Sequence, residues 1–468
     1  MGDNRNRYLM KNTIIFTLGN FGSKLISFFL IPLYTNVLTT TEYGVVDLVV
    51  TVGTVAVPVL TLNISESVMR FALDKDADKQ KITQIGTGVL LIGMLVGLFI
   101  FPICRSFDKI SQYSVLVYLY VIALAASQMY LCDLRGKELL VYYSIGNVLN
   151  TLFIAGFNIL FLLVFKDGIR GYLKAYIIAN ALTAIYAIII GKGYKSLHSF
   201  HIDKGLLLRM AKYSVVLIPN SFMWWIMNSS DRIMVSSMVS VAANGIYAVS
   251  YKLPTLVSTL TAIFNQAWSY SAIREEGTED ESDYNNKIFK ALIGIVMLTG
   301  IGILTIAKPF LSVYVSEEYY TAWKYMPFLT VGCVYLTLAS FMATSYTVHK
   351  DSFGYLFSGM FGAIFNIVMN FMLIPLIGVY GASIATCISY ILVFIFRLFH
   401  TRKYIKYNVR NKEFWMGSII LFLSAVLMFV DSWIGFCLQC FLLIVVLCLF
   451  SDIWLPIVRK IFKLKGRQ

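Results

Sequence analysis

Fourteen apolar segments, each about as long as a membrane-spanning helix, constrain the fold of this 468-residue chain more than any other feature. A helix of ~20 apolar residues covers the hydrocarbon core of a bilayer. Since 58% of the residues are hydrophobic and only 14% are charged, little polar sequence remains for a soluble domain. The sequence therefore predicts an all-α polytopic membrane protein, with helices at residues 12–37, 44–66, 82–104, 114–132, 139–165, 172–191, 213–238, 245–270, 288–310, 325–348, 353–376, 380–400, 414–431 and 433–456.

The charged residues between these segments predict the orientation of the chain. Most of the 39 Lys and Arg residues fall in the terminal segments and in one alternate set of loops, and few fall in the opposite set. Cytoplasmic loops carry an excess of Lys and Arg, so we expect both termini in the cytoplasm. The formal charge of +14 then reflects topology and contact with anionic lipid headgroups, and we expect no nucleic-acid partner.

The two halves of the chain resemble each other. A shift of 201 residues aligns Thr13 with Ser214 and Gly44 with Gly245, and a Gly-x-x-Gly pattern occurs at both 168–171 and 378–381. An even number of helices per repeat leaves both halves in the same orientation, so we expect two six-helix bundles related by a pseudo-two-fold axis along the membrane normal. The predicted parts are an N-terminal bundle at 1–191, a cytoplasmic linker at 192–212, a second bundle at 213–400, and helices 13 and 14 with a basic cytoplasmic tail at 401–468.

Lys24 lies near the middle of the first apolar segment. A charge at the bilayer centre costs ~2.5–3.5 kcal/mol on insertion scales, so such a residue normally faces protein or a watery cavity. At helical spacing, Lys24 shares one face with Asn20 and other polar residues. A structural lysine paired with a neighbouring helix would explain this position, but we favour a cation that faces a cavity.

The repeated polar faces predict a central cavity with a positive lining. We expect Lys24, Arg232 and Lys252 to provide its charge. Because uncompensated buried charge is unfavourable, a phosphate-bearing substrate would complement these cations. The structural alternative is that two ion pairs, Asp231–Arg232 and Asp47–Lys252, only tie helices together.

Other residues of the same faces are weaker candidates. Asn20, Asn228, Trp225 and Tyr251 would contact the substrate, since aromatic rings suit sugar faces, although aromatic belts at the membrane surface use the same residue types. Asp47 and Asp231 are candidate carboxylates for coupling to a proton or sodium gradient. Glu66, Arg70 and Arg274 would form an inner gate by ion pairing, or only a local surface pair.

The sequence carries no sign of a catalytic or metal site. Cys437 and Cys440 form a CxxC pattern without flanking ligands, which indicates helix packing, and the 4 His residues form no cluster. There is no Gly-rich phosphate loop ending in GK[ST], so we expect no ATP use, and we expect no metal or cofactor. We therefore expect that the protein is not an enzyme.

The residues 11–48, KNTIIFTLGNFGSKLISFFLIPLYTNVLTTTEYGVVDL, resemble the opening of polysaccharide-export flippases. These are the Wzx-type, O-antigen branch of the MOP superfamily, to which the MATE transporters also belong. The characteristic pieces are Lys24, the turn at 38–44 and the Gly-Val-Tyr-Gly-Ala sequence at 378–382. The resemblance covers the whole chain in helix number and order.

This resemblance implies a flippase of the bacterial cytoplasmic membrane. Its substrate would be an undecaprenyl-diphosphate-linked oligosaccharide, the repeat unit of a surface polysaccharide such as O-antigen or capsule, moved to the outer leaflet by alternating access. Lys24, Arg232 and Lys252 would contact the diphosphate or acidic sugars. The polymerase and glycosyltransferases of the same pathway would be partners. The alternatives are a MATE-like drug/cation antiporter, a lipid II-type flippase and, without a large external loop to support it, a membrane polysaccharide polymerase.

Overall fold

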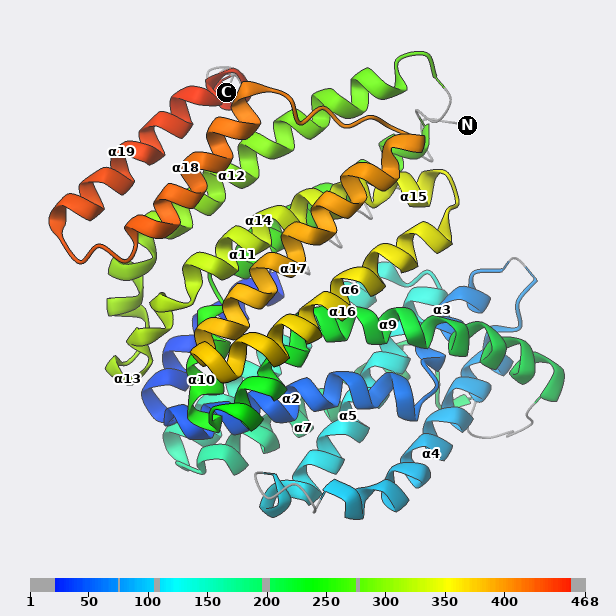
Figure 1. Ribbon diagram of the computed structural model, residues 1–468. Helices are drawn as coiled ribbons and strands as arrows, with labels where there is room; N and C mark the ends of the chain where they lie inside the picture. The colour runs from blue at the N-terminus through cyan, green and yellow to red at the C-terminus, as the bar shows by residue number, and fades with distance from the viewer. Residues whose placement is uncertain (1–21, 75, 105–109, 196–202, 275–277, 456–468) are drawn as a thin grey trace, which may run out of the picture. The chain divides into compact units, whose positions relative to one another are not determined.

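The computed structural model describes residues 22–74, 76–104, 110–195, 203–274 and 278–455. Within these ranges the chain forms helices and no strand, as Figure 1 shows. Nine of the helices described there are long and apolar enough to cross a membrane. The chain divides into two compact units, Met1–Ile233 and Met234–Gln468. The prediction of an all-α polytopic membrane protein is confirmed.

The first unit begins, in the described part, with a helix at residues 22–37. Its other helices pack closely in the pairs α5–α7, α6–α7 and α3–α5. They are α2 (Thr40–Leu60), α3 (Ile64–Ala72), α4 (Lys79–Cys104), η1 (Ser111–Tyr113), α5 (Ser114–Gly136), α6 (Leu140–Asn158), the π-helix η2 (Ile159–Val164), α7 (Gly168–Ile190) and most of α9 (Lys204–Met238).

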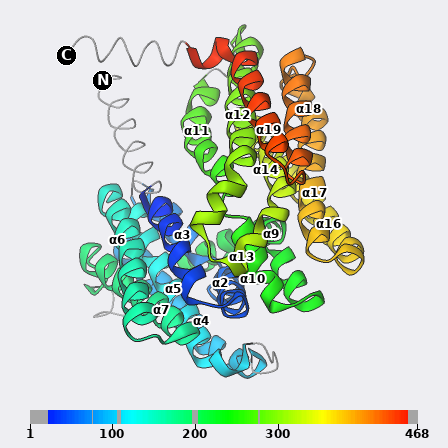
Figure 2. The same cartoon turned by 90° about the vertical axis from the view of Figure 1, so that its left-hand side faces the viewer.

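The second unit contains the remaining helices. They are α10 (Val241–Ser250), α11 (Pro254–Arg274), α12 (Glu281–Tyr314), α13 (Glu317–Tyr320), η3 (Thr321–Lys324), α14 (Met326–Met342), α15 (Thr344–Val348), α16 (Ser352–Ile377), α17 (Val379–His400), η4 (Thr401–Lys403), α18 (Lys412–Leu427) and α19 (Trp433–Leu449). α17 packs against α14 and α16, while α18 and α19 pack against each other and against α12, side by side in Figure 2.

The helix boundaries differ from the predicted ones at three breaks. The second predicted segment divides into α2 and α3, the eighth into α10 and α11, and the tenth into α14 and α15. Asn63, at the first break, has a left-handed φ of 53°. Pro254 begins α11 at the second break, and a proline has no amide hydrogen to continue the preceding helix. Apolar composition alone does not reveal such interruptions.

The repeat is visible in the local structure at two places along the chain. The helix at 22–37 and α9 end at positions that are related by the predicted shift, Val37 and Met238. The next helix is then capped at equivalent residues. Thr39 forms a capping box with Glu42, and the Ser240 side chain accepts a hydrogen bond from the next turn of α10. The predicted register of the repeat is confirmed at this junction.

The two Gly-x-x-Gly patterns build the same helix hairpin in each unit. Gly168 and Gly378 have φ of +53° and +60°, a region that favours glycine. A Cβ at Gly171 would lie 3.1 Å from the carbonyl oxygen of Phe161, and one at Gly381 would lie 2.4 Å from the α16 backbone. The first glycine therefore makes the turn, and the second allows the close approach of α7 to η2 and of α17 to α16.

Candidate functional site

A buried ion pair joins α2 and α9 within the first unit. Nη1 of Arg232 lies 2.6 Å from Oδ1 of Asp47, and their side chains are only 18% and 8% exposed. Nearby, the indole of Trp225 donates a hydrogen bond to the backbone oxygen of Thr51 at 3.0 Å. Along α2 the two contacts run forward in sequence, from Asp47 to Thr51. Along α9 their partners run backward, from Arg232 to Trp225. The two helices are therefore antiparallel and are held by two polar contacts.

This ion pair combines one member of each pair that the sequence analysis considered. Asp231 is 1% exposed, and its carboxylate accepts the backbone N–H of Arg232 at 2.9 Å. Adjacent residues of a helix point in directions about 100° apart, so the two side chains do not share a face. The Arg232 guanidinium turns instead to α2, where Asp47 neutralises it. Arg232 is thus a structural cation in this conformation.

Lys24 is an exposed residue of the helix at 22–37. Further along this helix, Ile31 and Tyr34 are buried, at 3% and 4% exposure. Close to Lys24, the Ser23 hydroxyl donates to the backbone oxygen of Asn147 at 3.3 Å and attaches the helix to α6. Asn20, also predicted to contact substrate, lies outside the described residues.

Five buried or half-buried tyrosines of the first unit form a cluster that the sequence analysis missed. The ring centroids of Tyr34 and Tyr172 are 5.1 Å apart, those of Tyr172 and Tyr176 are 4.6 Å apart, and Tyr43 and Tyr120 complete the cluster. The tyrosines come from the helix at 22–37, α2, α5 and α7. Because each helix contributes only one or two rings, no periodic pattern announces the cluster.

Tyr251 and Lys252 lie in the turn between α10 and α11 of the second unit. Tyr251 is 4% exposed and its ring packs edge-on against Tyr247, with centroids 5.2 Å apart. Its ring is therefore part of an apolar cluster with Leu329 and Val379. Lys252 is half-buried, and the helix break places it outside regular helix.

Two of the remaining predicted site residues contact residues four positions away in the sequence. Asn228, an exposed residue of α9, donates to the backbone oxygen of Trp224 at 2.7 Å. Arg70 pairs with Asp74 at 2.6 Å, and both side chains are more than half exposed. The C-terminal end of α3 thus carries a surface ion pair that does not use Glu66. The side chain of Arg274 lies outside the described part of the structure.

One buried cation of the second unit is held by hydrogen bonds to neighbouring helices. Arg397 of α17 is 1% exposed. Its Nε donates to Ser358 Oγ at 3.0 Å, and its Nη1 donates to the backbone oxygen of Ala339 at 2.9 Å. Because α14 ends at Met342, Ala339 belongs to its last turn. Arg397 therefore ties the end of α14 to α16 and α17.

Among the described residues, no three His, Cys, Asp or Glu side chains come together in a way that could hold a metal ion.

Comparison with known proteins then identifies the family. The polysaccharide biosynthesis protein family matches residues 9–270, more than half of the chain. The chain belongs to this family. An uncharacterized membrane protein of Methanocaldococcus jannaschii is 23% identical over 314 residues, and the match covers 62% of this chain and 58% of that protein.

Solved structures of transporters share the fold. The lipid II flippase MurJ in an inward closed conformation has a TM-score of 0.70 at 14% identity, covering 95% of this chain and 100% of that chain. An inward-facing multidrug resistance MATE family transporter of the MOP superfamily has a TM-score of 0.64 at 12% identity, covering 83% of this chain and 94% of that one. The resemblance is therefore confirmed for the polysaccharide biosynthesis family and for the fold that these transporters share.

Proposed function

We propose that this member of the polysaccharide biosynthesis protein family is a flippase for an undecaprenyl-diphosphate-linked oligosaccharide. It would move the polysaccharide repeat unit from the cytoplasmic to the outer leaflet by alternating access. The observation that carries the proposal is Lys24, an exposed cation on an apolar helix in a chain of this family. A charged residue within a helix long enough to span the bilayer normally contacts a ligand or lines an ion pathway.

The ion pair of the first unit divides the roles among the three predicted cations. Arg232 is neutralised by Asp47, so its charge holds α9 against α2 in this conformation. Lys24 is exposed and Lys252 is half-buried in a helix break. We assign these two lysines to the diphosphate or to acidic sugars, since an ammonium group is a compact charge that suits phosphate oxygens.

The same argument changes the roles of the neighbouring candidates. Trp225 and Tyr251 act in packing, because the Trp225 indole is bonded to α2 and the Tyr251 ring is buried. Asp231 is the better candidate for coupling to a proton or sodium gradient. Its carboxylate is buried, and Asp47 already serves Arg232. Asn228 remains a candidate substrate contact on the exposed side of α9.

The cellular setting of the proposal follows from the charge distribution and the family. We place the protein in the bacterial cytoplasmic membrane with both termini in the cytoplasm. We also propose the bundle boundaries at 1–191 and 213–400, the linker at 192–212 and the appended pair at 401–468. Glycosyltransferases would supply the substrate and a polysaccharide polymerase would consume it. The inner gate of Glu66, Arg70 and Arg274 would act at the cytoplasmic end.

The fold shared with MATE transporters makes a drug/cation antiporter the second candidate. Such an antiporter needs acidic groups that are open to a cationic substrate. In the first unit, the carboxylate of Asp47 instead faces Arg232 at 2.6 Å. The exposed charge in the first helix is a lysine, which repels cations. These observations favour an anionic substrate.

The test is transport in liposomes that contain the purified protein and an undecaprenyl-diphosphate-linked oligosaccharide. Lectin binding at the outer surface measures the flipped fraction. We expect Lys24→Ala to slow flipping by about tenfold or more, since one charge-assisted contact to phosphate is lost, and Lys24→Arg to keep part of the rate.

Lys174→Ala is the matched control, because this lysine is 43% exposed and pairs with Asp167 on the same unit. It should flip at the normal rate. Normal flipping by Lys24→Ala would contradict the assigned role of the lysine. Uptake of a cationic dye without any flipping by the wild type would favour the antiporter.

A further inference from the structure

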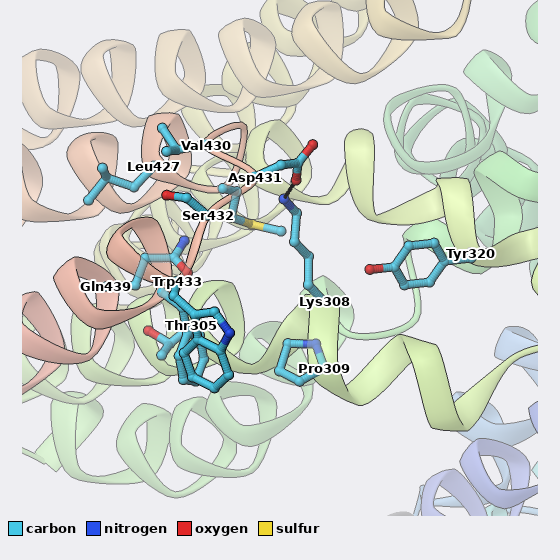
Figure 3. Close-up of a pocket in the computed structure, with 12 residues that line it drawn as sticks. Thr305, Lys308, Pro309, Tyr320, Leu427, Val430, Asp431, Ser432, Trp433 and Gln439 are labelled. Carbon is cyan, nitrogen blue, oxygen red and sulfur yellow. Dashed lines mark hydrogen bonds and ion pairs between the residues drawn. The ribbon is translucent and has the colours of Figure 1, made fainter.

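A cavity of about 480 Å³ lies within the second unit, between the C-terminal end of α12 and the connection from α18 to α19. Figure 3 shows Lys308 of α12 reaching across the cavity to Asp431 of this connection, with Tyr320 and Trp433 at its sides. Leu427 and Val430 add apolar surface. The cavity thus combines apolar walls with one cation and one anion.

The two charges differ in how firmly they are held. Nζ of Lys308 lies 3.8 Å from the ring centroid of Trp323, and the lysine side chain is only 22% exposed. The Asp431 side chain is 78% exposed and contacts Lys308 at 2.5 Å. A contact between an ammonium group and an indole face remains when the carboxylate moves away. Lys308 is therefore a fixed cation with an anion that can move.

Exposed ion pairs contribute little to stability, so a ligand can separate Lys308 from Asp431 easily. A ligand with a single charge would pair with one of these residues and leave the other without its partner. A ligand with both a phosphate and an ammonium group would replace the pair completely, phosphate on Lys308 and ammonium on Asp431. The charge pattern of the cavity thus matches a zwitterion.

The position of the cavity agrees with a lipid ligand. In the topology proposed above, this end of α12 is at the outer surface of the membrane. Trp433 is 81% exposed, and with Tyr320 and Trp323 it provides the aromatic side chains that are common at the level of lipid headgroups. Apolar helices α18 and α19 lead from the cavity into the membrane, so acyl chains would lie along them.

We infer that this cavity binds the headgroup of an outer-leaflet phospholipid with a phosphate and a primary ammonium, the chemistry of phosphatidylethanolamine. A primary ammonium donates hydrogen bonds to the Asp431 carboxylate, whereas a quaternary ammonium has no N–H to donate. The bound lipid would attach α12 to the α18–α19 hairpin. This site is separate from the substrate residues proposed above and does not depend on their function.

Native mass spectrometry of the purified full-length protein tests the inference, with phosphatidylethanolamine, phosphatidylcholine and phosphatidylglycerol offered in equal amounts. The wild type should retain phosphatidylethanolamine in preference to the other two lipids. Lys308→Ala should weaken this binding by about tenfold. Asp431→Asn should remove the preference for ethanolamine over glycerol headgroups, because it removes the negative charge that pairs with the ammonium and leaves Lys308 in place.

Lys290→Ala is the control, since this lysine is on the same helix and pairs with Glu413 at 3.0 Å. It should keep the lipid preference of the wild type. Asp431→Asn changes an exposed residue and should fold normally, so it decides the question if Lys308→Ala is unstable. Equal retention of the three lipids by the wild type, or an unchanged preference in Asp431→Asn, would overturn the inference.

Discussion

The ion pair between Asp47 and Arg232 makes a quantitative prediction about the first unit. The atoms are 2.6 Å apart, and the side chains are 8% and 18% exposed. At a charge separation near 4 Å and an effective dielectric constant of ~20, two charges attract by ~4 kcal/mol. Removal of one partner leaves the other charge buried, which typically destabilises a protein by ~3–5 kcal/mol. Arg232→Ala should therefore unfold far more easily than the wild type.

The measurement is the fraction of protein that stays monodisperse in detergent after heating, followed by size-exclusion chromatography. For a unit of this size, a loss of ~3–5 kcal/mol lowers Tm by on the order of 10 °C. Asp47→Ala should lower Tm by a similar amount. The double variant should lose less than the sum of the two single variants, because it leaves no uncompensated charge.

The control is an ion pair of the same length in a different environment. Arg70 and Asp74 are also 2.6 Å apart, but their side chains are 53% and 56% exposed. Arg70→Ala should therefore lose less than ~1 kcal/mol. If Arg70→Ala and Arg232→Ala lowered Tm equally, or if the two substitutions at Asp47 and Arg232 were additive, the argument from burial would be wrong.

Three further predictions use the same heating assay. Gly381→Ala should destabilise the protein by ~1–3 kcal/mol or more, because the new Cβ would lie 2.4 Å from the α16 backbone. Gly359→Ala is the control: a Cβ at this position would have no atom within 4 Å, so the substitution should be neutral or stabilising. Thr39→Ala and Ser240→Ala each remove a helix cap and should each lose ~1 kcal/mol; no loss at either would contradict the repeated cap. The ammonium group of Lys403, 2.8 Å from the Asp351 carboxylate, and further donors lower the pKa of Asp351 to about 2 from 3.8. The contribution of Asp351 to stability is therefore complete above about pH 4 and is lost as the pH falls toward 2. Asp351→Asn should make Tm less dependent on pH in this window.

Much of the helical scaffold could be predicted because it depends on local patterns. Each of the fourteen predicted segments contains helix in the described part of the chain. The breaks were missed because apolar composition continues across them, as at Asn63. Of the candidate site, the sequence suggested two ion pairs as the alternative to substrate contact, Asp231–Arg232 and Asp47–Lys252. The structure instead pairs Arg232 with Asp47. The roles of Lys24 and Lys252 in binding stay predictions.

The sequence by itself determined the features that a few neighbouring residues encode. These are the apolar helices, the repeat, the caps at Thr39 and Ser240, and the glycine hairpins. Only the tertiary structure decided which polar side chains meet. Asp47 and Arg232 are 185 residues apart in the chain, and the tyrosine cluster is assembled from four helices. The physical reason is that a helix pattern shows which face is polar, whereas packing decides which neighbouring helix that face contacts.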